Sequence, residues 1–153
     1  MINSARACSV TGHRKMEKDI ENIPLKETFI KLIKDGGYDT FLIGMALGFD
    51  TLCFQVLEKI RKEENIKLIA CVPCKSQAER FSYVQKKEYQ RMINSADEIV
   101  LISEEYTSDC MRKRNEYLVD NSSVIISYLR RDFGGTLQTV NYARKKGIKI
   151  ISL

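Results

Sequence analysis

Apolar residues of this chain occur in six short runs that are separated by amphipathic segments. The runs cover about residues 7–11, 40–44, 67–72, 97–102, 123–128 and 148–152. They are rich in Ile, Val and Leu, as strands of a parallel sheet are when helices cover both of its faces. The pattern therefore predicts six buried strands.

Helical patterns fill the gaps between these runs. The clearest covers about residues 49–64, where apolar side chains recur at helical spacing. Further helices are expected at Leu25–Lys34, Ser76–Asn94, Asp109–Val119 and Leu137–Lys146. Ser76 followed by Glu79 has the form of a capping box, which predicts that the third helix begins there.

The alternation of strands and helices defines the expected fold class. Right-handed crossovers between consecutive strands place helices on both faces of one sheet. We therefore predict an α/β, Rossmann-like, doubly wound and mainly parallel sheet of about six strands. A chain of 153 residues fits one such domain, which is expected to span residues 1–153.

Small residues follow three of the predicted strands. Gly12 follows the first strand, Gly44 and Gly48 follow the second, and Gly134, Gly135 and Thr136 follow the fifth. In an open parallel sheet these turns lie at the carboxyl edge, where ligands bind. Four arginines are near them in the sequence: Arg14, Arg112, Arg114 and Arg131. The combination predicts an anion pocket, most plausibly for a nucleotide phosphate.

Several of these residues have two interpretations. Thr136 can donate to a phosphate or simply cap its helix. Asp50 can bind a ribose hydroxyl or stabilise a helix start, because carboxylates are favoured there. The turn from Gly44 to Asp50 is neither a G-x-G-x-x-G fingerprint nor a Walker A loop. His13, the single histidine, is either a ligand to phosphate, an acid or base, or a structural group.

Arginines at the start of the predicted helix 109–119 are electrostatically unfavourable, which hints that they bind an anion. Arg114 and Asn115 cannot both share a helical face with Arg112, because adjacent positions diverge by ~100°. The alternative is that part of this basic run points into solvent.

Composition narrows the function classes. The chain is 44% hydrophobic and 29% charged with a net charge of +5, and its charges are dispersed rather than gathered into a basic tract. Nucleic acid is therefore an unlikely partner. No run is long enough to span a membrane and no secretory segment is evident, so a cytoplasmic location is expected.

Five cysteines at irregular spacing argue against a disulfide framework. Cys71 and Cys74 form a single CxxC without further ligands. We interpret Cys71 as a buried apolar residue and expect no metal site and no cofactor.

Five motifs occur in a recognisable order. They are TGHR at 11–14, GMALGFD at 44–50, CVPCKSQAERF at 71–81, MRKRNEYLVDNSS at 111–123 and GGTLQTVNYARKKGIKII at 134–151. This set resembles the YpsA-like branch of the SLOG superfamily, which is related to the DprA and LOG families. The resemblance implies a Rossmann-like domain for nucleotides or nucleotide-derived ligands. It places Gly12, Arg14, Gly44, Gly48, Arg114, Asn115 and residues 134–136 in the pocket.

The resemblance to LOG phosphoribohydrolases is incomplete. Their P-G-G-x-G-T-x-E-E motif carries two glutamates, whereas Leu137, Gln138 and Thr139 follow Thr136 here. Loss of the carboxylate removes a charge that would stabilise a cationic transition state. DprA proteins bind single-stranded DNA, but this chain has neither their flanking domains nor a basic stripe.

Three hypotheses follow. The first is a binding domain for a nucleotide or nucleotide-derived metabolite that acts as a sensor, carrier or sequestering protein, either as a monomer or as a homo-oligomer. The second is an N-glycosidic hydrolase acting on nucleoside monophosphates, with Asp50 or Glu116 as carboxylate and His13 as acid or base. The third is a DprA-like nucleic-acid-binding module. The identity of the base, the number of phosphates and the pathway stay open.

Overall fold

Six parallel strands form one sheet in the computed structural model, which describes residues 2–153. The strands are β1 (Ala7–Gly12), β2 (Thr40–Ile43), β3 (Lys67–Cys74), β4 (Glu98–Ser103), β5 (Val124–Tyr128) and β6 (Lys149–Ser152). Their order in the sheet is β4-β3-β2-β1-β5-β6. The prediction of a six-stranded, doubly wound α/β fold is confirmed.

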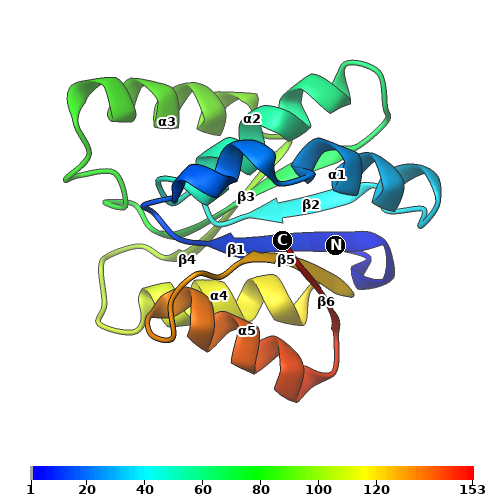
Figure 1. Ribbon diagram of the computed structural model, residues 1–153. Helices are drawn as coiled ribbons and strands as arrows, with labels where there is room; N and C mark the ends of the chain where they lie inside the picture. Colours follow the sequence, from blue (N-terminus) through cyan, green and yellow to red (C-terminus); the bar gives the residue numbers. More distant parts are fainter. Residues whose placement is uncertain (1) are drawn as a thin grey trace.

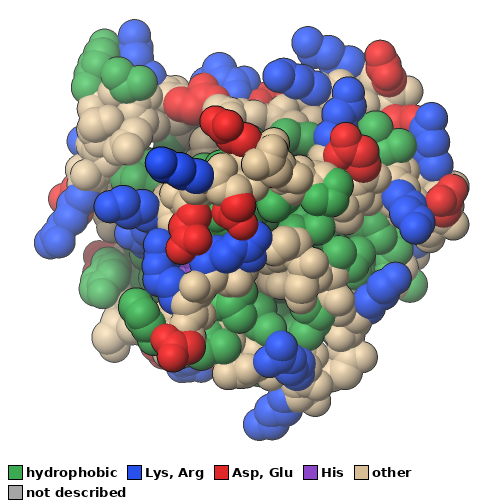
Figure 2. All heavy atoms as spheres, viewed as in Figure 1, with side chains coloured by type: hydrophobic (Ala, Val, Ile, Leu, Met, Phe, Trp, Pro, Cys, Tyr) green, Lys and Arg blue, Asp and Glu red, His purple; other side chains and the backbone are tan. Residues whose placement is uncertain are grey.

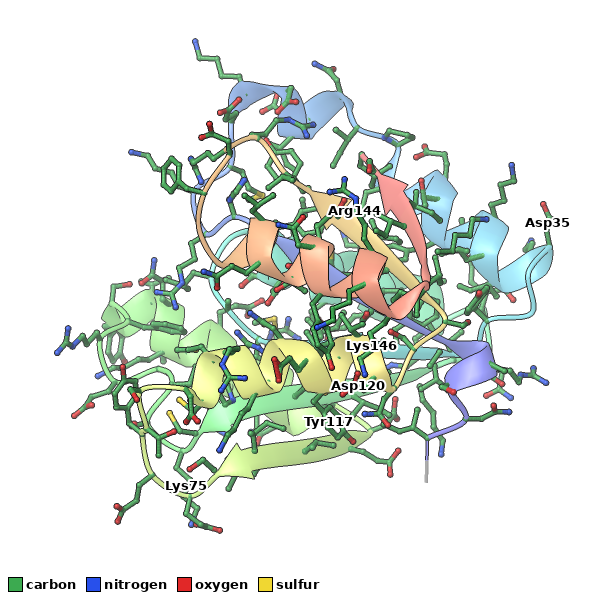
Figure 3. The ribbon with its side chains drawn as sticks, turned by 90° about the horizontal axis from the view of Figure 1, so that it is seen from below. Asp35, Lys75, Tyr117, Asp120, Arg144 and Lys146 are labelled. Atoms are coloured by element: carbon green, nitrogen blue, oxygen red, sulfur yellow. The ribbon has the colours of Figure 1, made fainter. Side chains whose placement is uncertain are left out.

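Helices cover both faces of this sheet (Figure 1). One layer holds α1 (Leu25–Lys34), α2 (Phe49–Arg61) and α3 (Tyr83–Ser95), and the other holds α4 (Cys110–Asp120) and α5 (Gly135–Lys146). Figure 3 shows α4 and α5 side by side, where the Lys146 ammonium lies 3.8 Å from an Asp120 carboxylate oxygen. No helix within residues 2–153 is long and apolar enough to cross a membrane.

The strand order reverses between β1 and β5. The chain first adds β2, β3 and β4 outward on one side of β1, and then returns to place β5 on its other side. In the resulting register Thr11 pairs with Ser127 and Gly12 with Tyr128. Such a reversal separates the two connections that leave the carboxyl ends of the central strands, and the space between them is where open α/β sheets bind ligands.

Aromatic packing supports the sheet directly beneath this reversal. The rings of Phe49 and Tyr128 stack with centroids 5.4 Å apart, and both side chains are fully buried. A Cβ atom at Gly12 would collide with the Phe49 ring, so the end of β1 requires glycine. The core thereby fixes how closely α2 approaches the carboxyl end of β1.

The predicted start of the third helix is wrong. The segment after β3 forms turns, with the Glu79 amide donating to the Ser76 carbonyl at 3.0 Å, and α3 begins only at Tyr83. Ser82 makes the capping box instead: its hydroxyl accepts from the Gln85 amide, and the Gln85 side chain accepts from the Ser82 amide. Two similar cap signals lie six positions apart, and the second one begins the helix.

Candidate functional site

A cavity of about 530 Å³ opens at the reversal between β1 and β5. Its walls come from residues 10–15, from Ala46 and Asp50, from Met111, Arg114, Asn115 and Leu118, and from Arg131, Phe133, Gly135 and Thr136. Figure 2 shows Lys and Arg side chains over much of the visible face, with one contiguous group left of centre, toward the side on which the strands β1 and β2 end in Figure 1. The volume lies within the ~300–1,000 Å³ typical of small-molecule sites.

Most of the residues singled out in the sequence line this cavity. Gly12, His13, Arg14, Asp50, Arg114, Asn115, Gly135 and Thr136 do so, whereas Gly44, Gly48, Arg112, Gly134 and Glu116 do not. Of the residues that do not line the cavity, some pack against lining residues and others lie on a different face of their helix.

Gly44 lies behind the wall, between two charged groups. Its carbonyl accepts hydrogen bonds from the Arg114 guanidinium and from the Gln77 amide. A Cβ atom at Gly44 would lie 2.9 Å from Arg114 Cζ and 3.0 Å from Asp50 Oδ2. Because position 44 has no side chain, the Arg114 guanidinium and the Asp50 carboxylate both fit beside it at the cavity.

Arg114 is a buried cation that joins α4 to the end of β2. Its Nε donates to Asn115 Oδ1 at 2.9 Å, and its Nη1 donates to the Gly44 carbonyl. Burial lowers the pKa of this guanidinium, while the Asp50 carboxylate opposes that shift. An arginine remains charged in such surroundings, so Arg114 supplies fixed positive charge to the cavity floor.

Asp50 supplies the carboxylate of the cavity from the first turn of α2. Its Oδ2 accepts from the Ala46 amide at 3.2 Å, which ties the loop after β2 to the helix. Burial raises the pKa of Asp50 to about 6, against the opposing effects of Arg114 and Arg14. The N-cap of α2 is Gly48, and Asp50 bonds back to the preceding loop rather than forming a side-chain cap at that position.

Gly48 positions the segment that carries Arg14. Its φ of +81° is in the left-handed region, and a Cβ atom there would collide with the Arg14 carbonyl. The Phe49 amide donates to the His13 carbonyl at 3.1 Å across the same contact. Gly48 is therefore a packing residue that allows α2 to hold the loop after β1.

His13 connects the loops that follow β1 and β5. Its Nε2 accepts a hydrogen bond from the Arg130 amide at 2.9 Å, so the bonded imidazole is neutral with its proton on Nδ1. Burial and the neighbouring Arg131 lower its pKa, which favours this neutral form. Arg131 adds a second link, because its Nη2 donates to the Lys15 carbonyl at 2.9 Å.

Arg112 and Glu116 lie on a different face of α4 from Arg114. Arg112 Nη1 lies 3.0 Å from a Glu116 carboxylate oxygen, one helical turn away. Both line a separate hollow, together with Gln138 and Thr139 of α5. The positions that correspond to the LOG glutamates therefore do not line the large cavity.

Lys15, Met111 and Phe133 line the cavity without having been singled out as site residues. Lys15 directly follows the TGHR motif, and Phe133 directly precedes the two glycines. Met111 is itself the first residue of the motif at 111–123, so position within or next to a motif is the signal in the sequence that could have found all three.

The two cysteines of the CxxC motif are both in β3 and both buried. Since successive strand residues alternate in direction, Cys71 and Cys74 project from opposite faces. The expectation that Cys71 is a buried residue is confirmed, and burial raises the pKa of its thiol to about 12. Within residues 2–153 no cluster of three His, Cys, Asp or Glu side chains could hold a metal ion.

A family model, a sequence relative and solved structures match this chain. A model of the YspA SLOG family matches residues 8–149. The uncharacterized SPbeta prophage-derived protein YoqJ of Bacillus subtilis (strain 168) is 37% identical over 120 residues, which cover 69% of this chain and 69% of YoqJ.

Two of the solved structures with a similar fold are of DNA processing protein A. The Streptococcus pneumoniae structure has a TM-score of 0.66 at 16% identity and covers 95% of this chain. The Helicobacter pylori structure, described for its single-stranded DNA binding mode, has a TM-score of 0.66 at 18% identity and covers 97%. This chain spans 49% and 65% of those two chains, respectively, and the likeness concerns the fold.

Proposed function

This chain belongs to the YspA SLOG family, and on that premise we propose that it binds a nucleotide or nucleotide-derived anion in the cavity between β1 and β5. It would act as a sensor, carrier or sequestering protein, with residues 1–153 forming one binding domain. The proposal includes a cytoplasmic location, which five buried free cysteines favour because thiols persist in reducing compartments.

The observation that carries the proposal is the charge lining the cavity. Four lining side chains are cationic, namely Arg14, Lys15, Arg114 and Arg131, and one, Asp50, is a carboxylate. The α5 N-terminus contributes Gly135 and Thr136, and the first amides of a helix have no partner within it. Cations together with free amides favour a phosphate-bearing ligand. Asp50 is an acceptor for hydroxyl groups on the same ligand.

Thermal denaturation with nucleotides tests this proposal. Adenosine, guanosine, cytidine and uridine monophosphates, cyclic nucleotides and NAD are each added to the purified chain. A ligand at a hundred times its Kd stabilises the native state by ~2.7 kcal/mol. For a chain of this size we expect the Tm to rise by about 5–10 °C.

Matched variants locate the binding. Arg14→Gln is expected to reduce the Tm shift strongly, whereas Arg112→Gln removes the same charge outside the cavity and should leave the shift intact. Gly135→Val adds bulk at the α5 N-terminus, where a Cβ meets no described atom within 4 Å, so the fold is kept while the shift is lost. Absence of any shift with the whole panel would refute the proposal.

A second candidate function is hydrolysis of an N-glycosidic bond. The specific observation in its favour is that Asp50, with a pKa raised to about 6, lies in the cavity with the cations. A carboxylate there could face the positive charge that develops on a ribose ring. Glu116 lacks this placement, which leaves Asp50 as the carboxylate of that hypothesis.

Binding of nucleic acid is the third candidate, and the same experiment includes it. The Helicobacter pylori neighbour is described as binding single-stranded DNA, so a single-stranded oligonucleotide is added to the panel. Stabilisation by the oligonucleotide but by no mononucleotide would replace the proposed ligand with single-stranded DNA.

A further inference from the structure

Phe133 is an aromatic residue at the cavity that the packing of the fold does not explain. Its side chain is 67% exposed although it lines the cavity. It belongs to none of the three hydrophobic clusters formed by residues 2–153. An exposed ring beside a cavity offers apolar surface that a bound ligand can remove from water, and such burial is favourable.

The backbone on both sides of Phe133 is anchored. On the amino side, the Arg130 amide donates to His13 Nε2 at 2.9 Å, and the Arg130 guanidinium lies 2.8 Å from an Asp19 carboxylate oxygen. Arg131 donates to the Lys15 carbonyl at 2.9 Å. On the carboxyl side, α5 begins at Gly135, two residues after Phe133. The backbone that carries Phe133 is therefore anchored on each side, which places this residue at the cavity.

The charged groups and the ring suit different parts of one ligand. Arg14, Arg131 and the α5 N-terminus suit a phosphate, whereas the Phe133 ring suits a flat, apolar group. Nucleobases present such a face, and stacking of a base on an aromatic side chain contributes ~1–3 kcal/mol.

We propose that Phe133 is the stacking platform for the base of the bound nucleotide. This inference rests on the proposed function and adds to it that the ligand carries a nucleobase, and that base stacking at the 129–134 loop determines affinity. Because every base has a stacking face, Phe133 would supply affinity for bases in general rather than preference for one.

Calorimetric titration with adenosine monophosphate and with ribose 5-phosphate tests this role. Phe133→Ala is expected to weaken the affinity for adenosine monophosphate by about fivefold or more, as the loss of stacking implies. The affinity of the Phe133→Ala variant for ribose 5-phosphate, which has no base, should equal that of the native chain. Phe133→Tyr keeps a stacking ring and should retain the affinity of the native chain.

Fluorescence provides a second, independent readout. The chain contains no Trp, so Phe133→Trp introduces a single indole at the cavity. Its emission should change on addition of adenosine monophosphate and stay constant with ribose 5-phosphate. Tyr106→Trp is the matched control, because Tyr106 is 66% exposed and does not line the cavity.

The outcomes separate this inference from the proposed function. If nucleotides bind the native chain and Phe133→Ala with equal affinity, the stacking role is wrong and nucleotide binding stands. If Phe133→Ala weakens both ligands equally, the residue merely supports the loop, which also overturns the inference. If the nucleoside monophosphates, the cyclic nucleotides and NAD all fail to bind the native chain, the proposed function and this inference fall together.

Discussion

Asp50 and Arg114 bring opposite charges into the buried part of the cavity from two different helices. Arg114 is held by Asn115 and the Gly44 carbonyl, whereas Asp50 is held by the Ala46 amide. Burial acts against the charged form of each, and each opposes that effect in the other. Because Arg114 stays charged and the pKa of Asp50 is raised to about 6, the charge of the cavity floor changes with pH through Asp50.

The ionisation of Asp50 contributes to the pH dependence of the free energy of unfolding. Its pKa rises from 3.8 to about 6 on folding, so between about pH 4 and 6 the native state binds more protons than the unfolded chain. The contribution of Asp50 to the free energy of unfolding should therefore fall as the pH rises through this window. A pKa rise of this size changes the contribution of Asp50 to the free energy of unfolding by about 3 kcal/mol, taking ~1.4 kcal/mol for each pKa unit.

Urea unfolding at closely spaced pH values, with native protein and Asp50→Asn, measures this effect. His13 acts with the opposite sign, because its lowered pKa makes stability decrease as the pH falls below about 6.5. That contribution is common to both proteins and cancels in their difference. Parallel curves for the two proteins would show that Asp50 does not titrate as inferred.

At the scale of secondary structure elements, the starts of α2 and α5 place side chains at the cavity, whereas no residue of α3 lines it. Gly48 lets α2 contact the loop after β1, and Gly134 with φ of +96° turns the chain into α5. The start of α3 depends on a reciprocal cap at Ser82. Because a helix start can depend on one side chain, a single substitution can test it.

The position of the α3 start gives a direct test. Ser82→Ala removes the hydroxyl that accepts from the Gln85 amide and should lower the free energy of unfolding by ~1 kcal/mol. Ser76→Ala should cost less, because Ser76 caps no helix and its hydroxyl lies 3.6 Å from the Cys74 sulfur. Chemical denaturation of both variants measures the two losses of stability. A larger loss for Ser76→Ala than for Ser82→Ala would favour a helix that begins near residue 76.

At the scale of the whole molecule, the reversal of strand order creates the cavity. It brings the ends of β1 and β5 together and places α4 and α5 on the same face, so that residues from four segments meet. Gln138 and Thr139 lie outside this meeting point, in a hollow with Arg112 and Glu116. Asp50 is the one carboxylate among the residues that line the cavity.

This arrangement leads us to expect little or no release of free base from nucleoside monophosphates. A carboxylate placed opposite the ribose stabilises the developing charge, and the positions matching the LOG glutamates are neutral. Chromatography of adenine, guanine, cytosine and uracil over hours measures the reaction. Because Gln138 lies away from the cavity, Gln138→Glu should not create activity.

Robust turnover would favour the enzyme hypothesis instead. In that case Asp50→Asn should abolish the reaction, whereas Glu116→Gln, which removes a carboxylate outside the cavity, should leave it intact. The comparison of these two variants identifies whether the cavity contains the reacting group.

Much of the fold could be predicted from the sequence because burial leaves local patterns. Continuous apolar runs marked all six strands, and helical spacing marked α2. The start of α3 could not be predicted with the same certainty, because two Ser-x-x-Glu/Gln patterns lie close together there and the capping box forms only at the second one, Ser82. The 3-10 helix Lys18–Asn22 was missed, since it buries no side chain and so lacks an apolar stripe.

For the site, the sequence by itself determined which segments meet at the carboxyl edge, since parallel strands all end there. Only the tertiary structure decided which side chains face the cavity. Gly44 and Arg114 touch although they are 70 positions apart, and Arg112, two residues from Arg114, points elsewhere. Contacts between distant segments depend on how helices rotate against the sheet, and no local pattern of residues encodes that rotation.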